Sequence, residues 1–109
     1  MKNKITDLAV ETGLIKLDAV IGRGRRKDFY DVYFINRLIP LEELLAAGEK
    51  KFKMMRDFQL MALEGLVQFD YADRDHQPDL LEALPWEIVR TYFIEQVKII
   101  GNKWFNMYF

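Results

Sequence analysis

Apolar residues recur at steps of three and four along most of this chain, and this spacing constrains the fold more than any other feature of the sequence. Such a period places apolar side chains on one face of an α-helix, whereas a half-buried strand needs strict alternation. No long window alternates, although residues 32–39 are rich in strand-forming side chains. We therefore predict an all-α fold, in which residues 1–109 form a single domain built as a bundle of about five helices.

Five segments carry a clear helical period or a proline that suits a first helical turn. Proline is favoured there because it lacks the amide hydrogen that a first turn leaves unbonded. In chain order the predicted helices are 10–21, one from residue 27 or 28, one from Pro40, 54–69 and one from Pro85.

Two stretches of the sequence favour interruptions of these helices. Residues 70–79 are polar, contain Pro78 and show no period, so we expect a loop there. Gly101 and Asn102 offer a weak stop to the last helix. No repeat and no Pro/Ser/Gly linker divides the chain into two domains.

The composition excludes several classes of protein. Half of the 109 residues are hydrophobic, which is enough apolar material for one core, and the net charge of -1 attracts neither nucleic acid nor an anionic membrane as a whole. The absence of cysteine excludes disulfides, thiolate metal sites and cysteine nucleophiles. No apolar run approaches the ~20 residues of a membrane helix, so we expect a cytoplasmic protein without a membrane partner.

Four cations gather in one short stretch just before a predicted helix, where the positive end of the helix dipole disfavours them. They are Arg23, Arg25, Arg26 and Lys27. We call residues 23–27 the basic turn. Guanidinium groups and free backbone N–H groups would bind a phosphate there, so the four are candidate nucleotide-binding residues. The alternative is a solvated basic turn capped by Asp28.

A candidate catalytic pair lies on either side of the basic turn. Lys16 falls near the end of the first predicted helix, and a short connection folds the next helix back against it. The Lys16 amine could then approach Asp28 or Asp31. Such a pair could position a phosphate and a proton acceptor, or it could be an interhelical salt bridge.

These residues belong to a longer motif that resembles the AbiEii-type nucleotidyltransferases. The run from Gly13 to Ile35, GLIKLDAVIGRGRRKDFYDVYFI, is similar to their segment in which a lysine helix precedes a glycine turn and a basic-Asp-aromatic-aromatic-Asp helix. Residues 66–73 (LVQFDYAD) and 84–93 (LPWEIVRTYF) are similar to later, less specific landmarks. The resemblance covers nearly the whole chain.

The resemblance implies a function. Those proteins transfer a nucleotide from a nucleoside triphosphate to an acceptor, which is tRNA in some members, and they include toxins of abortive-infection toxin-antitoxin pairs. By resemblance Lys16 contacts the triphosphate, Asp28 orients the acceptor or nucleotide, and Asp31 is the second aspartate of the motif.

One part of the family pattern is missing from this chain. A complete enzyme carries, upstream, a Gly-Ser turn and an Asp-x-Asp pair that holds Mg²⁺. This sequence has neither, and Asp73 and Asp75, although spaced by two, lie in an expected loop without a Gly-Ser turn. We therefore expect no metal site and no cofactor in this chain alone, whereas the complete enzyme would use Mg²⁺ and a nucleoside triphosphate.

We expect the chain to be the helical carboxy-terminal part of such an enzyme, inactive without the metal-binding half. Either the gene is split or truncated, or a separate protein supplies that half. The alternative function is a non-catalytic protein-protein interaction module, and a third is nucleic-acid binding by the basic turn. Candidate partners are the missing half, an antitoxin, an RNA acceptor and a second copy joined through exposed apolar surface. His76 is expected at the surface, and Trp86, Trp104 and Phe105 in packing contacts rather than as a platform for bases.

Overall fold

The computed structural model describes residues 4–51 and 57–106, and every regular element in these two ranges is a helix. This confirms the all-α prediction, with six described helices in place of about five. They are α1 (Lys4–Gly22), α2 (Arg26–Ile35), α3 (Leu41–Lys51), α4 (Phe58–Gly65), α5 (Asp70–Arg74) and α6 (Trp86–Phe105).

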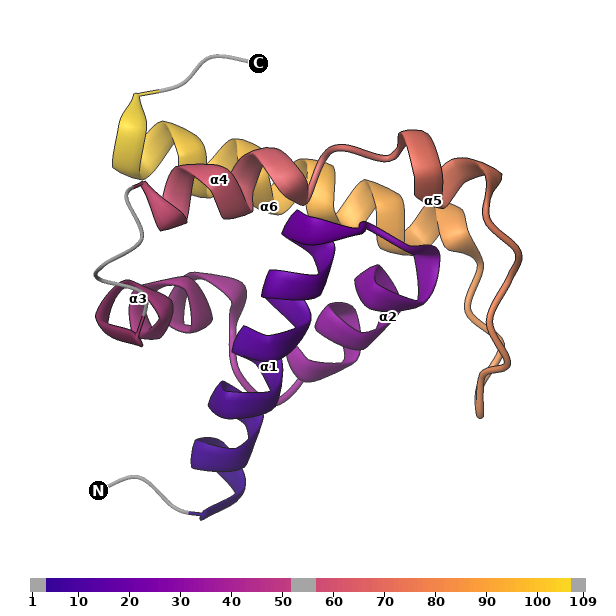
Figure 1. Cartoon of the computed structure of the whole chain (residues 1–109), viewed down its shortest axis with the longest axis horizontal. Coiled ribbons are helices and arrows are strands. Elements are labelled where there is room, and N and C mark those ends of the chain that lie inside the picture. The colour runs from indigo at the N-terminus through magenta and orange to yellow at the C-terminus, as the bar shows by residue number, and fades with distance from the viewer. Residues whose placement is uncertain (1–3, 52–56, 107–109) are drawn as a thin grey trace.

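Helix α1 organises the bundle, since it contacts α2, α3 and α4. Helix α6 packs on α2 and α4, and α5 sits on α2 (Figure 1). The connection between α1 and α2 is short and turns sharply at Gly24, whose φ of +59° is one that glycine adopts without strain. The sharp turn folds α2 back along α1, as the sequence predicts, and so brings the candidate residues of the two helices together.

An aromatic cluster fixes α2 against the rest of the bundle. The ring of Phe29 lies 5.3 Å from Phe69, 5.6 Å from Trp86 and 5.9 Å from Phe93, measured between centroids. All four side chains are buried, and they come from α2, from the turn after α4 and from α6. Burial of Phe29 orients the first two turns of α2, which carry Asp28 and Asp31.

Two glycines let the helices approach one another closely. A Cβ placed on Gly13 of α1 would lie 2.8 Å from a methyl carbon of Leu44 in α3. A Cβ on Gly48 of α3 would lie 2.4 Å from the ring of Phe58 in α4. The close packing of α3 on α1 and α4 therefore depends on the lack of a side chain at Gly13 and Gly48.

Several predicted boundaries differ from the structure. Helix α1 begins at Lys4, six residues earlier than predicted, and α4 ends at Gly65 rather than residue 69. Residues 54–56 of the predicted fourth helix lie outside the described part of the chain. The strand-forming stretch 32–39 continues α2 as far as Ile35 and then forms a turn.

The expected loop over 70–79 and the expected stop at Gly101 were wrong in part. Residues 70–74 form α5, which buries Ala72 and whose last carbonyl oxygens accept hydrogen bonds from Arg26 of α2. Gly101 is buried inside α6, which continues to Phe105 and is capped by Asn106 in the left-handed conformation. Both errors arise because tertiary contacts, and not local propensity, decide these ends.

Candidate functional site

The predicted lysine and one of its two predicted carboxylates meet between α1 and α2. Lys16 Nζ lies 2.9 Å from Asp31 Oδ2, and the two side chains are 28% and 36% exposed. The pair is therefore accessible to solvent and to a ligand. Half-exposed ion pairs contribute ~0–1 kcal/mol to stability, so the contact is a weak reason for the fold and leaves the amine available for other partners.

A groove of about 560 Å³ opens beside this pair. We call it the Lys16 groove. Its walls come from α1, from α2 and from the segment between α5 and α6. The residues that give it charge or hydrogen-bonding groups are Lys16, Lys27, Tyr30, Asp31, His76 and Asp79.

Tyr30 ties the far wall of the Lys16 groove to α2. Its hydroxyl donates to the carbonyl oxygen of Leu84 at 2.6 Å and accepts a hydrogen bond from the Gln77 amide at 2.8 Å. The Tyr30 side chain is itself almost fully buried. The shape of the groove thus depends on a buried hydroxyl, which the sequence did not single out.

Asp28, the other predicted carboxylate, is occupied by the basic turn. The guanidinium of Arg23 donates to both of its oxygens at 2.9 and 2.8 Å, and the backbone N–H of Arg25 donates to Oδ2 at 3.1 Å. The Asp28 side chain is fully buried, whereas that of Arg23 is 54% exposed. Asp28 thus caps the first turn of α2 in the manner of a capping box. In this structure the Lys16 amine pairs with Asp31, and Asp28 holds the helix start.

Arg25 and the start of α2 are bound by a second carboxylate, fifty residues along the chain. The Arg25 guanidinium donates to both oxygens of Asp75 at 3.3 Å, and the backbone N–H of Arg26 donates to the same carboxylate at 3.1 Å. These hydrogen bonds, that of Arg25 foremost, lower the pKa of Asp75 to about 2. Asp75 therefore stays ionised and neutralises this part of the basic turn.

The Arg26 side chain turns to α5 and away from the Lys16 groove. It donates to the carbonyl oxygens of Ala72 at 2.8 Å and Asp73 at 3.0 Å. A further hydrogen bond of 3.1 Å reaches Gln77, and the ring of Trp86 lies 5.1 Å from the guanidinium carbon. Arg26 thus acts as a tertiary clamp between α2, α5 and α6.

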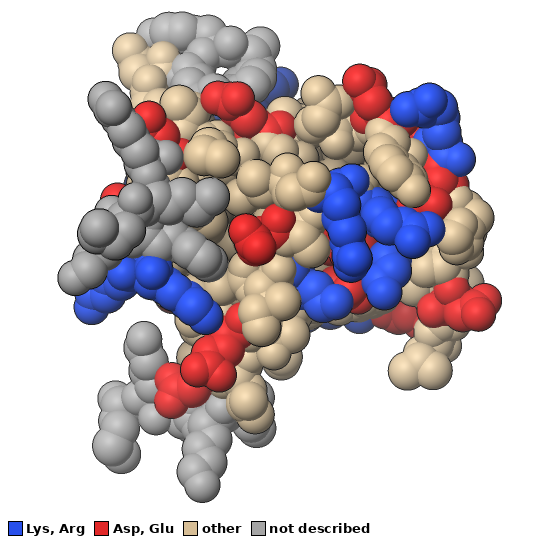
Figure 2. Space-filling view, viewed as in Figure 1, with Lys and Arg blue, Asp and Glu red and all other residues tan. Residues whose placement is uncertain are grey.

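The cations of the basic turn are unfavourable at the positive end of the α2 dipole, and carboxylates and backbone carbonyl oxygens of the same chain offset this repulsion. Figure 2 shows basic side chains gathered on the side of the molecule where the α1–α2 connection lies in Figure 1, with acidic atoms between them. The three arginines of the turn are held by protein groups, while Lys27 is exposed and lines the Lys16 groove. Of the four predicted phosphate ligands, Lys27 is thus the one that the structure places beside Lys16.

The described part of the chain holds no group of three or more His, Asp or Glu side chains that could bind a metal ion. Asp73 accepts hydrogen bonds from Trp86 at 2.9 Å and Arg90 at 3.2 Å, which lower its pKa, the Trp86 bond most. Asp73 and Asp75 therefore serve different partners. The Mg²⁺ ion that the resemblance implies has no fitting set of ligands among these residues.

The remaining candidates lie largely as expected. His76 is 77% exposed, with Nδ1 3.1 Å from Asp75, and it also lines the Lys16 groove, which the sequence did not reveal. Trp86 is buried, and Trp104 is partly buried, with its ring centroid 6.5 Å from that of Phe105. Phe105, expected in packing contacts, is 39% exposed. Among the described helices, none has the length and apolar character needed to cross a membrane.

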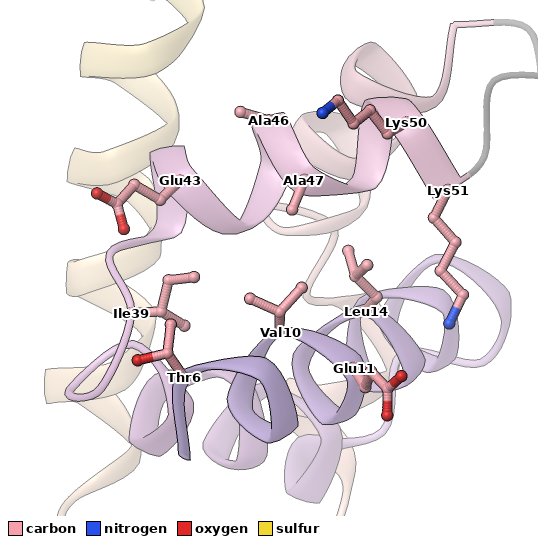
Figure 3. Close-up of a pocket in the computed structure, with 10 residues that line it drawn as sticks. All are labelled: Thr6, Val10, Glu11, Leu14, Ile39, Glu43, Ala46, Ala47, Lys50 and Lys51. Carbon is pink, nitrogen blue, oxygen red and sulfur yellow. The ribbon is translucent and has the colours of Figure 1, made fainter. Parts of the chain in front are cut away.

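A second, more apolar groove of about 880 Å³ separates α1 from α3 (Figure 3). We call it the α1–α3 groove. Its floor is formed by Val10, Leu14, Ile39 and Ala47, and charged side chains stand at its rim. The two grooves meet different sides of α1, so a ligand in one leaves the other open.

Comparison with known proteins shows a similarity to a longer protein. The chain is 34% identical over 86 residues to the uncharacterized protein aq_aa25 of Aquifex aeolicus (strain VF5), and the match covers 77% of this chain and 40% of that protein. The chain thus spans less than half the length of this curated relative. No family model matches the chain, and no solved structure does.

Proposed function

We propose that this chain is the helical part of a two-part nucleotidyltransferase of the AbiEii type, and that the Lys16 groove receives phosphates of a nucleoside triphosphate. The observation that carries the proposal is the Lys16–Asp31 pair, 2.9 Å apart and partly exposed at the edge of a groove. It lies within the run of residues 13–35 that resembles the family. A structural salt bridge alone would not require the adjoining groove or a second cation, Lys27, in its lining.

Each charged group of the groove has a proposed role that follows from its contacts. Lys16 and Lys27 bind phosphate oxygens as point charges, as ammonium groups do in many nucleotide sites. Asp31 orients the Lys16 amine, and its exposed oxygen can accept the proton of an acceptor hydroxyl. Asp28, buried and held by the basic turn, supports the site from behind by fixing the first turn of α2. This differs from the acceptor-orienting role that the resemblance implies for Asp28.

The metal-binding half is proposed to come from outside these 109 residues. The extra length of the Aquifex aeolicus relative, of which the match covers 40%, supports a larger functional unit. Helix α1 offers a face for it, because Leu8 and Ile15 are 63% and 61% exposed and lie two turns apart. Ile15 precedes Lys16, so a partner bound to this face would bring its own groups to the Lys16 groove. The same face supports the second candidate function, a non-catalytic interaction module.

A titration with inorganic tripolyphosphate tests the nucleotide site without the missing half. Backbone NMR spectra of the chain are expected to shift at residues 16, 27 and 30–31, and the Lys16→Gln variant is expected to lose at least about tenfold in affinity, or 1.4 kcal/mol. Lys98→Gln on α6 is the matched control, since Lys98 is exposed and lies outside the Lys16 groove. Lack of binding, or shifts confined to residues 23–26, would contradict the proposal. Lack of binding would leave the interaction module as the better account.

A further inference from the structure

One face of α3 carries two small side chains flanked, at equal distances, by an acidic and a basic side chain. Glu43, Ala46, Ala47 and Lys50 are spaced at i, i+3, i+4 and i+7, so they share one side of the helix. All four line the α1–α3 groove, where Figure 3 shows the two alanines between the two charged side chains. Glu43, Ala46 and Lys50 are exposed and Ala47 is partly so. The face therefore has small side chains in its middle, an acidic side chain at one end and a basic side chain at the other.

This arrangement is complementary to itself. Glu43 and Lys50 are equally far from the midpoint between Ala46 and Ala47, and about 10 Å apart along the helix axis at 1.5 Å per residue. If a second α3 crosses the first in the opposite direction at the alanine pair, each Glu43 meets the Lys50 of the other copy. A two-fold axis requires such a self-complementary patch.

We propose that a second copy of this chain covers the α1–α3 groove, forming an antiparallel dimer in which α3 packs on α3 at Ala46 and Ala47. Small side chains at the crossing point allow helix axes to approach to about 8 Å, the lower end of the usual range. Val10 of α1 and Ala46 and Ala47 of α3, which are partly or fully exposed in one copy, then lose contact with water, which supplies the favourable hydrophobic term.

The charges of α3 support a partner for this face in particular. Two acidic residues lie side by side in the first turn of α3, Glu42 and Glu43. Glu42 is used within the chain, where the amine of Lys103 lies 2.8 Å from Oε2. Glu43 and Lys50 form no ion pair with any residue in 4–51 or 57–106, and Figure 3 shows them on either side of the alanine pair. Within the described ranges their charges have no ion-pair partner, and a second copy would supply one.

The dimer does not depend on the proposed catalytic role. The Lys16 groove is built from α1, α2 and the segment before α6, whereas the dimer face is built from α1 and α3. Loss of phosphate binding would therefore leave the dimer prediction intact, and a monomeric chain would leave the phosphate site intact.

Charge reversal and its compensation test the dimer. By sedimentation equilibrium the wild-type chain is expected to reach twice the 13.0 kDa of one copy. The Glu43→Lys and Lys50→Glu variants each place like charges together at two points of the interface, and each is expected to weaken association at least about tenfold. The Glu43→Lys/Lys50→Glu double variant restores opposite charges and is expected to dimerise nearly as well as wild type.

A matched control lies on the same helix. Glu49→Lys makes the same charge change at an exposed position that does not line the groove, so its association is expected to equal that of wild type. Circular dichroism of each variant shows whether the monomer is folded. A wild-type chain that stays monomeric at about 1 mM, where even a millimolar dimer would form, overturns the proposal. So does a dimer that neither single reversal weakens, or a double variant that is no better than the single ones.

Discussion

Replacing Gly48 by alanine should destabilise the protein, although alanine is the better helix former. Gly48 lies in α3, and the added Cβ would lie 2.4 Å from one ring carbon of Phe58 and 3.0 Å from a second. Phe58 is 1% exposed, so its ring cannot move into solvent. Overpacking of this kind costs about 1–3 kcal/mol, and the gain in helix propensity offsets about 0.5–1 kcal/mol. The difference is a net loss of about 0–2.5 kcal/mol, and because the Cβ contact at 2.4 Å is severe we expect about 1–2 kcal/mol.

Urea unfolding followed by circular dichroism measures this loss in the free energy of unfolding, and thermal unfolding measures the fall in melting temperature. A chain of 109 residues should have an unfolding entropy of about 230 cal/mol/K, so the melting temperature should fall by about 4–9 °C. Gly22→Ala is the control, because a Cβ there meets nothing within 4 Å and the variant should be as stable as wild type or slightly more so. All samples must share one protein concentration, since dimerisation would add to apparent stability.

A second substitution separates overpacking from other causes. Phe58→Leu removes the ring that the new Cβ would strike, so the Gly48→Ala/Phe58→Leu variant should be less unstable than the sum of the two single losses. A Gly48→Ala protein at least as stable as wild type would refute the packing of α3 on α4 described above. Strict additivity of the two losses would also refute it.

The other predictions concern the walls of the Lys16 groove. The pKa of Asp75 is lowered to about 2, so its ion pair with Arg25 stabilises the fold above about pH 4, and this contribution is lost as the pH falls from about 4 to about 2. Asp75→Asn should therefore be less stable than wild type at pH 6 in urea unfolding, and the difference should shrink toward pH 2; a constant difference would contradict the pairing. Tyr30→Phe removes the hydroxyl that donates a hydrogen bond to the Leu84 carbonyl oxygen, so the free energy of unfolding should fall by about 1–2 kcal/mol and amide exchange in residues 77–84 should become faster. Unchanged exchange would show that the hydroxyl does not hold this wall.

The sequence predicted the helices well because their apolar period is local. The pairing of a lysine on one helix with a carboxylate on the next was also predictable, since the turn between the helices is short. The sequence could not show which of the two carboxylates, Asp28 or Asp31, pairs with Lys16. The choice depends on the orientation of α2, and the aromatic cluster around Phe29 sets that orientation with residues forty and more positions away.

The fate of the basic turn lay beyond sequence reasoning for a similar reason. The cations predicted an anion beside them, and the anions present are Asp28 and Asp75 of the same chain. Asp28 is close in sequence, and the alternative interpretation of the basic turn has it as a cap, although it was also a candidate catalytic residue. Asp75 is fifty residues from Arg25, in a stretch without a helical period, and only α5 and its contact with Arg26 place it there. Helix α5 itself depends on this tertiary contact, which leaves no local pattern in the sequence, and so the segment was expected to be a loop.

In the proposed site the amine of Lys16 is held by Asp31 at the edge of a phosphate-binding groove. NMR of ¹³C-methylated lysines reports it most directly, through the signal of Lys16 in folded wild type and variants. We expect Asp31→Asn to move this signal, Asp28→Asn to leave it nearly unchanged, and tripolyphosphate to move it in the wild type. A Lys16 signal that ignores both Asp31→Asn and tripolyphosphate would contradict the account.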